Sequence, residues 1–233
     1  MDPLKLVVVS AGLGKPSATR MLADRLAEAT GRGLREQHRA VHVRVLELRE
    51  LAVDIANNLV TGFPNATLAD ALLAVERADG LIVVSPIFSA SYSGLFKSFF
   101  DVLPHRSLTG KPVLIAATGG TSRHSLALDH ALRPLFSFLA AIVVPTGVYA
   151  ATEDWGAPSG AGAASLAGRI DRAAAELTAL LAALPSASAR TAAPAPGGHR
   201  NAGTDASAGA VGADGGIEES VVPFEQLLAR VTD

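Results

Sequence analysis

Short apolar runs alternate with amphipathic stretches over the first 184 residues of the chain. Continuous runs rich in Val, Ile and Leu predict strands, which fall at 4–10, 40–48, 80–85, 111–118 and 141–150. Apolar residues that recur every three or four positions predict helices, which fall at 18–30, 68–77, 95–103, 126–139 and 163–184. The chain therefore alternates between strand and helix.

This alternation predicts an α/β fold. Strands that are apolar throughout, and that are separated by helices, form parallel sheets covered on both faces. Five such strands fit a doubly wound sheet of flavodoxin type, with the order 2-1-3-4-5 for the predicted strands. Ligands of such sheets bind at the carboxyl ends of the strands, so we expect the site where the first, third and fourth strands end.

The composition changes near residue 185, and this change predicts the domain organisation. Residues 1–184 are expected to form the folded domain. Residues 185–216 are dominated by Ala, Gly, Pro and Ser, which bury too little apolar surface to offset the ordering entropy, so this linker is expected to be disordered. Residues 217–233 form a short C-terminal segment, in which "VVPFEQLLARV" fits either a docking helix or a frayed tail.

Composition and charge exclude several classes of function. The 233 residues carry a formal net charge of -2 and no cysteine, which removes disulfides and thiolate chemistry. The sequence has no basic stripe of the kind that indicates a nucleic-acid partner. Its histidines do not have the spacing of metal ligands. The N-terminal apolar run is too short to span a membrane and has no signal-peptide features. We therefore expect a cytoplasmic protein without a metal, nucleic-acid or membrane partner.

The first candidate binding segment is "SAGLGKPSAT", at residues 10–19. It matches no Walker A loop, because Pro16 follows Lys15, and no Rossmann fingerprint, because Ser17 stands in place of the third glycine. What remains is a hydroxyl-rich turn at a helix N-terminus, where unpaired N–H groups and the helix dipole favour a phosphate. The alternative is that Ser17 only caps the helix. The candidate ligands are Ser10, Ser17, Ala18 and Thr19.

The second segment, "SPIFSASYSG", follows the third predicted strand and is interpreted as a loop. Large apolar side chains in a surface loop call for a reason, and a flat aromatic ligand lying on the loop supplies one. The candidates for contact with the ring are Pro86, Ile87, Phe88 and Ser89. Alternatively, Phe88 and Tyr92 fill the core or a subunit interface.

The third segment is "TGGTSRH", at residues 118–124. Its glycines allow the backbone to approach a ligand, and its N–H groups suit the charge that develops on a reduced flavin ring. The candidates are Thr118, Gly119, Gly120 and Thr121; alone, they equally fit a tight turn. Together, the three segments outline a phosphate site, a ring face and a pyrimidine edge, which is the outline of FMN.

Two longer motifs, "SPIFSASYSGLFKSFFD" and "ATGGTSRHSLALDHALRPL", resemble the NADPH-dependent FMN reductases, and above all the branch that supplies reduced flavin to alkanesulfonate and related flavin-dependent monooxygenases. The resemblance covers residues 4–155. It implies FMN, hydride transfer from NADPH or NADH, a homodimer or homotetramer, and a monooxygenase partner. By position it assigns the phosphate to Ser10 and Ser17–Thr19, the isoalloxazine to Pro86–Ser89 and its edge to Gly119–Thr121. Many relatives carry Arg in the phosphate turn, where this chain has Gly14-Lys15-Pro16.

Pro134 interrupts the helix predicted at 126–139. It has no N–H to donate to the carbonyl of His130 and its ring clashes there, so we expect a kink or a π-bulge. Similar relatives place an irregular helix at a subunit interface, which predicts that His130 lies near one. Hydride transfer between two cofactors needs no acid–base dyad, and no catalytic residue is assigned.

Three alternatives stay open at this point. An FMN-bound quinone or azo reductase differs only in its electron acceptor. A non-enzymatic flavodoxin-like electron carrier is typically shorter and more acidic than this chain. A Rossmann dinucleotide enzyme would use Glu47 as its ribose ligand, but the missing third glycine argues against it.

Overall fold

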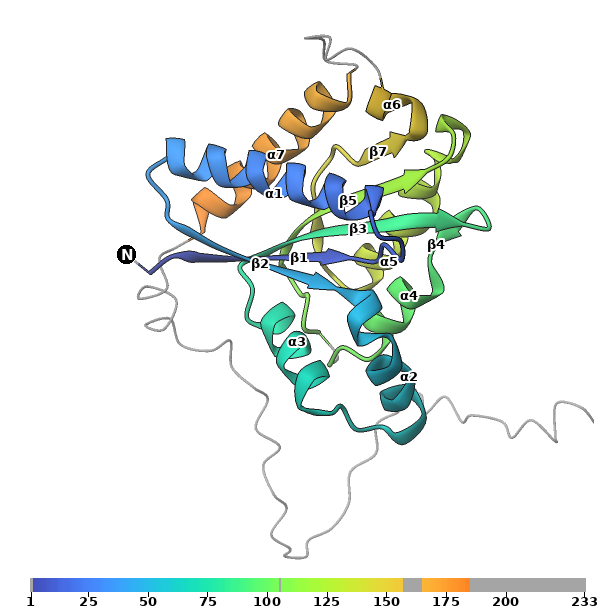
Figure 1. Cartoon of the computed structure of the whole chain (residues 1–233). Coiled ribbons are helices and arrows are strands. Elements are labelled where there is room, and N and C mark those ends of the chain that lie inside the picture. Colours follow the sequence, from blue (N-terminus) through green and yellow to red (C-terminus); the bar gives the residue numbers. More distant parts are fainter. Residues whose placement is uncertain (1, 105, 157–164, 185–233) are drawn as a thin grey trace, which may run out of the picture. The chain divides into compact units, whose positions relative to one another are not determined.

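A computed structural model describes residues 2–104, 106–156 and 165–184, which form three layers (Figure 1). The predicted linker 185–216 and segment 217–233 lie outside the described residues. The strands are β1 Leu4–Ser10, β2 Val41–Glu47, β3 Gly80–Phe88, β4 Ser91–Tyr92, β5 Pro112–Gly119, β6 Ile142–Val143 and β7 Val148–Ala151. The α-helices are α1 Ala18–Glu36, α2 Ala52–Thr61, α3 Ala66–Glu76, α4 Gly94–Asp101, α5 Arg133–Phe138, α6 Thr152–Gly156 and α7 Leu166–Ala183.

The sheet has the predicted order. Its parallel strands follow the path β2-β1-β3-β5-β6, which is the flavodoxin-like order 2-1-3-4-5 when the predicted strands are counted. The fifth predicted strand is divided: β6 pairs with the start of β5, and β7 pairs with its end. The intervening segment contains Pro145, which cannot donate to a ladder, and this accounts for the break.

Alternation along the strands builds a core on each face of the sheet. In β1, Leu6 and Val8 face α1 and α7, whereas Val7 and Val9 face the opposite side. Figure 1 shows α1 and α7 on one face and α2, α3 and α4 on the other. Successive strand side chains point to opposite faces, so strands buried on both sides are apolar at nearly every position.

Helix α2 was not predicted from the sequence. Residues 52–61 expose the apolar side chains Val53, Leu59 and Val60. The exposed face of this segment is therefore only weakly polar. A short 3-10 turn, η1 (Leu48–Leu51), joins β2 directly to this helix. The consequence for the site is that Arg49, within η1, follows the carboxyl end of β2.

Neither a membrane-spanning helix nor a metal-binding cluster occurs among the described residues. No helix there has both the length and the apolar character needed to cross a bilayer. In the same part of the chain, no group of three or more His, Cys, Asp or Glu side chains is arranged to hold a metal ion.

Candidate functional site

The three predicted segments meet at the carboxyl edge of the sheet. Ser10, at the end of β1, lies opposite Val84 of β3, and Pro86 lies opposite Thr118 of β5. The strands are parallel, so the segments that follow them leave at the same edge. A hydrogen bond of 2.8 Å between the buried hydroxyls of Thr19 and Thr118 joins the first segment to the third.

The first segment is a compact turn that leads into α1. Ser17 is the N-cap, and its Oγ accepts a hydrogen bond from the N–H of Arg20 (3.2 Å). A Cβ placed on Gly12 would lie 2.0 Å from Ser17 Oγ and 2.9 Å from Thr19 Cβ, so a larger residue there would displace the turn. Ser10 and Thr19 are buried beneath the turn. The first turn of α1 has no acidic residue, which leaves its positive dipole end available to an anion.

A chain of ion pairs braces this turn. Glu47 Oε1 accepts from Arg20 Nη1 at 2.5 Å, and Glu47 Oε2 pairs with Arg49 Nη2 at 2.7 Å. Arg49 Nη1 then donates to the carbonyl of Gly14 at 2.8 Å. Both oxygens of Glu47 are therefore engaged by arginines within the protein. Arg49 was missed from the sequence because it lies 35 residues from Gly14.

The second segment is a hairpin, so its prediction as a loop was wrong. Strand β3 continues to Phe88 and turns back into β4, pairing Ile87 with Tyr92 and Phe88 with Ser91. The turn residues Ser89 and Ala90 have positive φ angles of 49° and 66°, as a two-residue hairpin with right-handed twist requires. Pro86 is tolerated because β1 pairs with β3 only as far as Val84, so its missing N–H interrupts no ladder with β1.

Ser85 closes the base of the hairpin. Its hydroxyl donates to the carbonyl of Pro86 (2.9 Å) and accepts from the N–H of Ser93 (3.0 Å). The ring centroid of Tyr92 lies 5.8 Å from that of Phe96, so Tyr92 packs against the core, one of the two roles left open. Phe88 is instead 48% exposed, and a ligand can reach it at the rim.

The third segment is held by a tyrosine that the sequence analysis did not identify. Tyr149, on β7, donates from its hydroxyl to the carbonyl of Thr121 (2.9 Å). A Cβ on Gly119 would lie 2.0 Å from that hydroxyl oxygen, whereas a Cβ on Gly120 would meet nothing within 4 Å. Burial, aided by the charge of Glu153, raises the pKa of Tyr149, so the hydroxyl stays a donor to higher pH than an exposed tyrosine would.

The irregular helix was correctly predicted. Residues Leu128–Leu132 form a π-helix, η3, immediately before Pro134 in α5. His130 is exposed on it and lines an open groove of about 520 Å³, together with Ser91, Tyr92, Lys97, Asp101, Ala131, Pro134, Leu135, Phe138 and Leu139. The position of His130 near a subunit interface stays a prediction.

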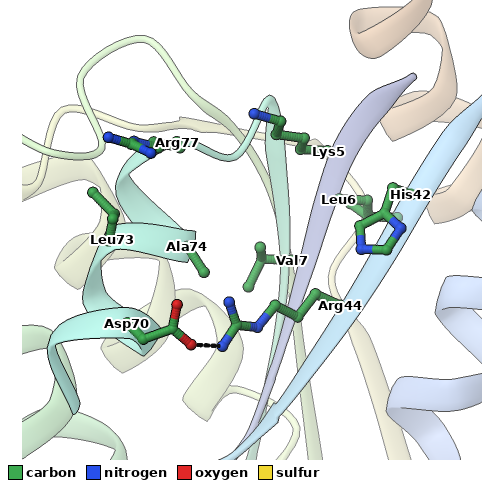
Figure 2. Close-up of a pocket in the computed structure, with 9 residues that line it drawn as sticks. All are labelled: Lys5, Leu6, Val7, His42, Arg44, Asp70, Leu73, Ala74 and Arg77. Carbon is green, nitrogen blue, oxygen red and sulfur yellow. Dashed lines mark hydrogen bonds and ion pairs between the residues drawn. The ribbon is translucent and has the colours of Figure 1, made fainter. Parts of the chain in front are cut away.

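A second groove lies at the other end of the strands. Figure 2 shows Lys5, His42, Arg44 and Arg77 around it, with Arg44 ion-paired to Asp70. Along β1, Lys5 is five positions before Ser10, which corresponds to roughly 16 Å. This groove is therefore separate from the candidate site.

Comparisons with known proteins identify the family of this chain. Residues 4–156 match the family model described as NADPH-dependent FMN reductase. An FMN reductase (NADPH) of Pseudomonas aeruginosa is 44% identical over 154 residues, which cover 66% of this chain and 80% of that protein. The NADH-dependent FMN reductase SfnF of Pseudomonas putida is 43% identical over 150 residues, covering 64% and 78%.

A solved structure is similar over nearly the same region. An oxidoreductase from Corynebacterium diphtheriae superposes with a TM-score of 0.73 at 48% identity, covering 77% of this chain and 97% of that one. The family match covers more than half of the chain and includes all three segments of the candidate site. The chain belongs to the NADPH-dependent FMN reductase family.

Proposed function

We propose that this chain catalyses NAD(P)H + H⁺ + FMN → NAD(P)⁺ + FMNH₂ and releases the reduced flavin to a separate flavin-dependent monooxygenase. The observation that carries the proposal is the convergence of the three segments at one edge of the sheet, joined by Thr19 and Thr118. Bound FMN would supply the redox chemistry as the acceptor of hydride from NAD(P)H. The protein binds and orients both rings.

The first segment would hold the phosphate of FMN. The hydroxyl of Ser17 and the backbone N–H groups of Ala18 and Thr19 gather at the start of a 19-residue helix. The buried hydroxyls of Ser10 and Thr19 would support the phosphate turn from beneath. The close approach at Gly12 keeps the turn compact. Phosphate is favoured at such a helix start by the unpaired N–H groups and the dipole together, so this chain does not need an arginine within the turn.

The second and third segments would hold the ring. Pro86, Ile87, Phe88 and Ser89 pass from buried to exposed along the hairpin and offer an apolar edge to the isoalloxazine. Thr118, Gly119, Gly120 and Thr121 would place backbone N–H groups at the pyrimidine edge, where negative charge develops on reduction. Open space around Gly120 supports close approach of a ligand. The chemistry requires no side chain that exchanges a proton with substrate, so we assign none as catalytic.

We further propose that the protein works in the cytoplasm as a homodimer or homotetramer. The groove beside the π-helix supports an interface there, since it exposes Phe138 (85%) next to His130, Pro134 and Tyr92. An exposed apolar surface of this kind marks a binding surface. Reductase activity is assigned to residues 1–184.

The proposal is tested by anaerobic oxidation of NADPH and of NADH with added FMN, FAD or riboflavin. Steady turnover of free FMN is expected. A single reduction of tightly held flavin, without turnover, would instead favour the electron carrier. Turnover that depends on an added quinone or azo dye would favour the FMN-bound quinone or azo reductase.

A further inference from the structure

Arg49 joins the phosphate turn to the sheet although it lies outside the turn. Its Nη1 donates to the carbonyl of Gly14 (2.8 Å), and its Nη2 pairs with Glu47 Oε2 (2.7 Å). The side chains of Arg49 and Glu47 are only 18% and 17% exposed. Both are therefore held among protein atoms, and the pair is less screened by solvent than a surface ion pair.

Glu47 also secures the other side of the turn. Its Oε1 binds Arg20 Nη1, and Arg20 lies in the first turn of α1, where its N–H donates to Ser17 Oγ. One carboxylate on β2 thus fixes both the middle of the turn, through Arg49 and Gly14, and its end, through Arg20.

We propose that Glu47 and Arg49 are positioning residues for the FMN phosphate, a proposal that rests on the proposed function. They hold residues 12–17 in the shape that presents N–H groups and hydroxyls, and they do not themselves touch the phosphate. Ordering a loop costs conformational entropy, and a turn already ordered before binding spares the ligand that cost.

The charges around the turn favour positioning over direct attraction. Arg20 and Arg49 are balanced by Glu47 and by Asp24, whose Oδ1 lies 2.8 Å from Arg20 Nε. The network is thus neutral as a whole. If it acted instead by attracting phosphate, removing the charge of Glu47 would release two arginines and tighten FMN binding. Positioning predicts the opposite sign.

The test measures the dissociation constants of FMN and riboflavin by quenching of flavin fluorescence at fixed ionic strength. Arg49→Met is expected to weaken FMN binding by about tenfold, the effect of losing a charged hydrogen bond. Riboflavin lacks the phosphate, so its dissociation constant should stay within about twofold. Glu47→Gln should weaken FMN selectively as well. The double variant should weaken FMN binding by less than the product of the two single effects, because Glu47 and Arg49 share part of one network.

Two further variants act as controls. Arg49→Lys keeps one donor and should restore part of the FMN affinity. Arg44→Met removes an ion-paired arginine that lies on β2, in the separate groove of Figure 2, and should leave both dissociation constants unchanged.

Several results would overturn the proposal. The first is tighter FMN binding by Glu47→Gln than by wild type. The second is an Arg49→Met variant whose dissociation constants for FMN and riboflavin rise equally, and the third is one whose FMN binding is unchanged. Equal affinity of the wild-type protein for the two flavins would also overturn it, because the turn then contributes nothing. A wild-type protein that binds neither flavin would remove the proposed function itself, which separates the two failures.

Discussion

The hydroxyl of Thr19 lies 2.8 Å from the hydroxyl of Thr118, across 99 residues of sequence. Thr19 lies in the first turn of α1, and Thr118 lies near the end of β5, with β3 between β1 and β5 in the sheet. This single contact fixes the distance between the proposed phosphate site and the proposed pyrimidine edge. The spacing of the site is therefore part of the core and is set before a ligand binds.

Replacing both of these threonines should cost less than the sum of the two single replacements. Thr19→Val or Thr118→Val alone leaves a buried hydroxyl without its partner, at a cost of about 1–3 kcal/mol in the free energy of unfolding. The double variant removes both hydroxyls and should lie closer to wild type than the sum of the singles. Urea unfolding measures all three; strictly additive losses would contradict the prediction.

Gly12→Ala should weaken FMN binding selectively. The new Cβ would lie 2.0 Å from Ser17 Oγ and 2.9 Å from Thr19 Cβ, so the turn must open. We expect a dissociation constant for FMN raised by at least about tenfold, as for a loss of about 1.4 kcal/mol. The matched control is Gly94→Ala, at a helix start where a Cβ meets nothing within 4 Å. Equal FMN affinities in the two variants would count against the phosphate assignment.

Gly119→Ala should destabilise the third segment, and Tyr149→Phe should partly rescue it. The alanine Cβ would lie 2.0 Å from the Tyr149 hydroxyl oxygen but 3.1 Å from the ring carbon that bears it. Removing the hydroxyl therefore relieves the worst clash, while also losing the bond to Thr121. In thermal unfolding, Gly119→Ala should have a lower Tm than the double variant. The opposite ranking would mean that Tyr149 is not the obstacle.

Lys111 should make stability rise at alkaline pH. Burial lowers the pKa of Lys111 to about 8, against opposing effects of Asp79 and Glu76, and its Nζ donates to the carbonyls of Val75 and Glu76. A folded pKa below the unfolded one means that the unfolded chain binds more protons between these two values, so stability increases with pH there.

The measurement for Lys111 compares wild type with Lys111→Met, so that other titrating groups cancel. The difference in free energy of unfolding should shift in favour of wild type by roughly 2–3 kcal/mol between pH 7 and pH 10. A difference that stays constant with pH would show that the ammonium is not desolvated.

Phe138→Glu should reduce the size of the assembly. Phe138 is 85% exposed in the groove beside the π-helix, so a charge there costs the single chain little but opposes an apolar interface. Light scattering after size exclusion should show a smaller species. The control, Phe63→Glu, changes a phenylalanine that is 81% exposed and lies outside this groove. An unchanged mass for Phe138→Glu, with wild type oligomeric, would place the interface elsewhere.

Much of the fold followed from local patterns in the sequence. The run "LKLVVVS" became β1 because continuous apolar residues suit a strand covered on both faces. Pro134 predicted the irregular helix, because its missing N–H and its ring affect the residues directly before it. Such effects operate within a few positions, and a single sequence displays them.

The remaining features depend on distant contacts. Phe88 was assigned to a loop, but pairing with Ser91 made it part of a hairpin; the turn Ser89-Ala90 lacks the glycine that usually signals one. Tyr149 and Arg49 bind carbonyls 28 and 35 residues away. Any tyrosine or arginine can donate to a carbonyl, so residue type alone did not identify these supports.

The alignment of β1, β3 and β5 also affects the lifetime of the protein. In a partly folded chain in which β5 has not joined β3, only two of the three proposed FMN-binding segments are in place. At the proposed site, flavin would bind the complete sheet best, and at a hundred times its dissociation constant it would add about 2.7 kcal/mol to the free energy of unfolding. We expect a cell short of flavin to hold a reductase that proteases degrade faster.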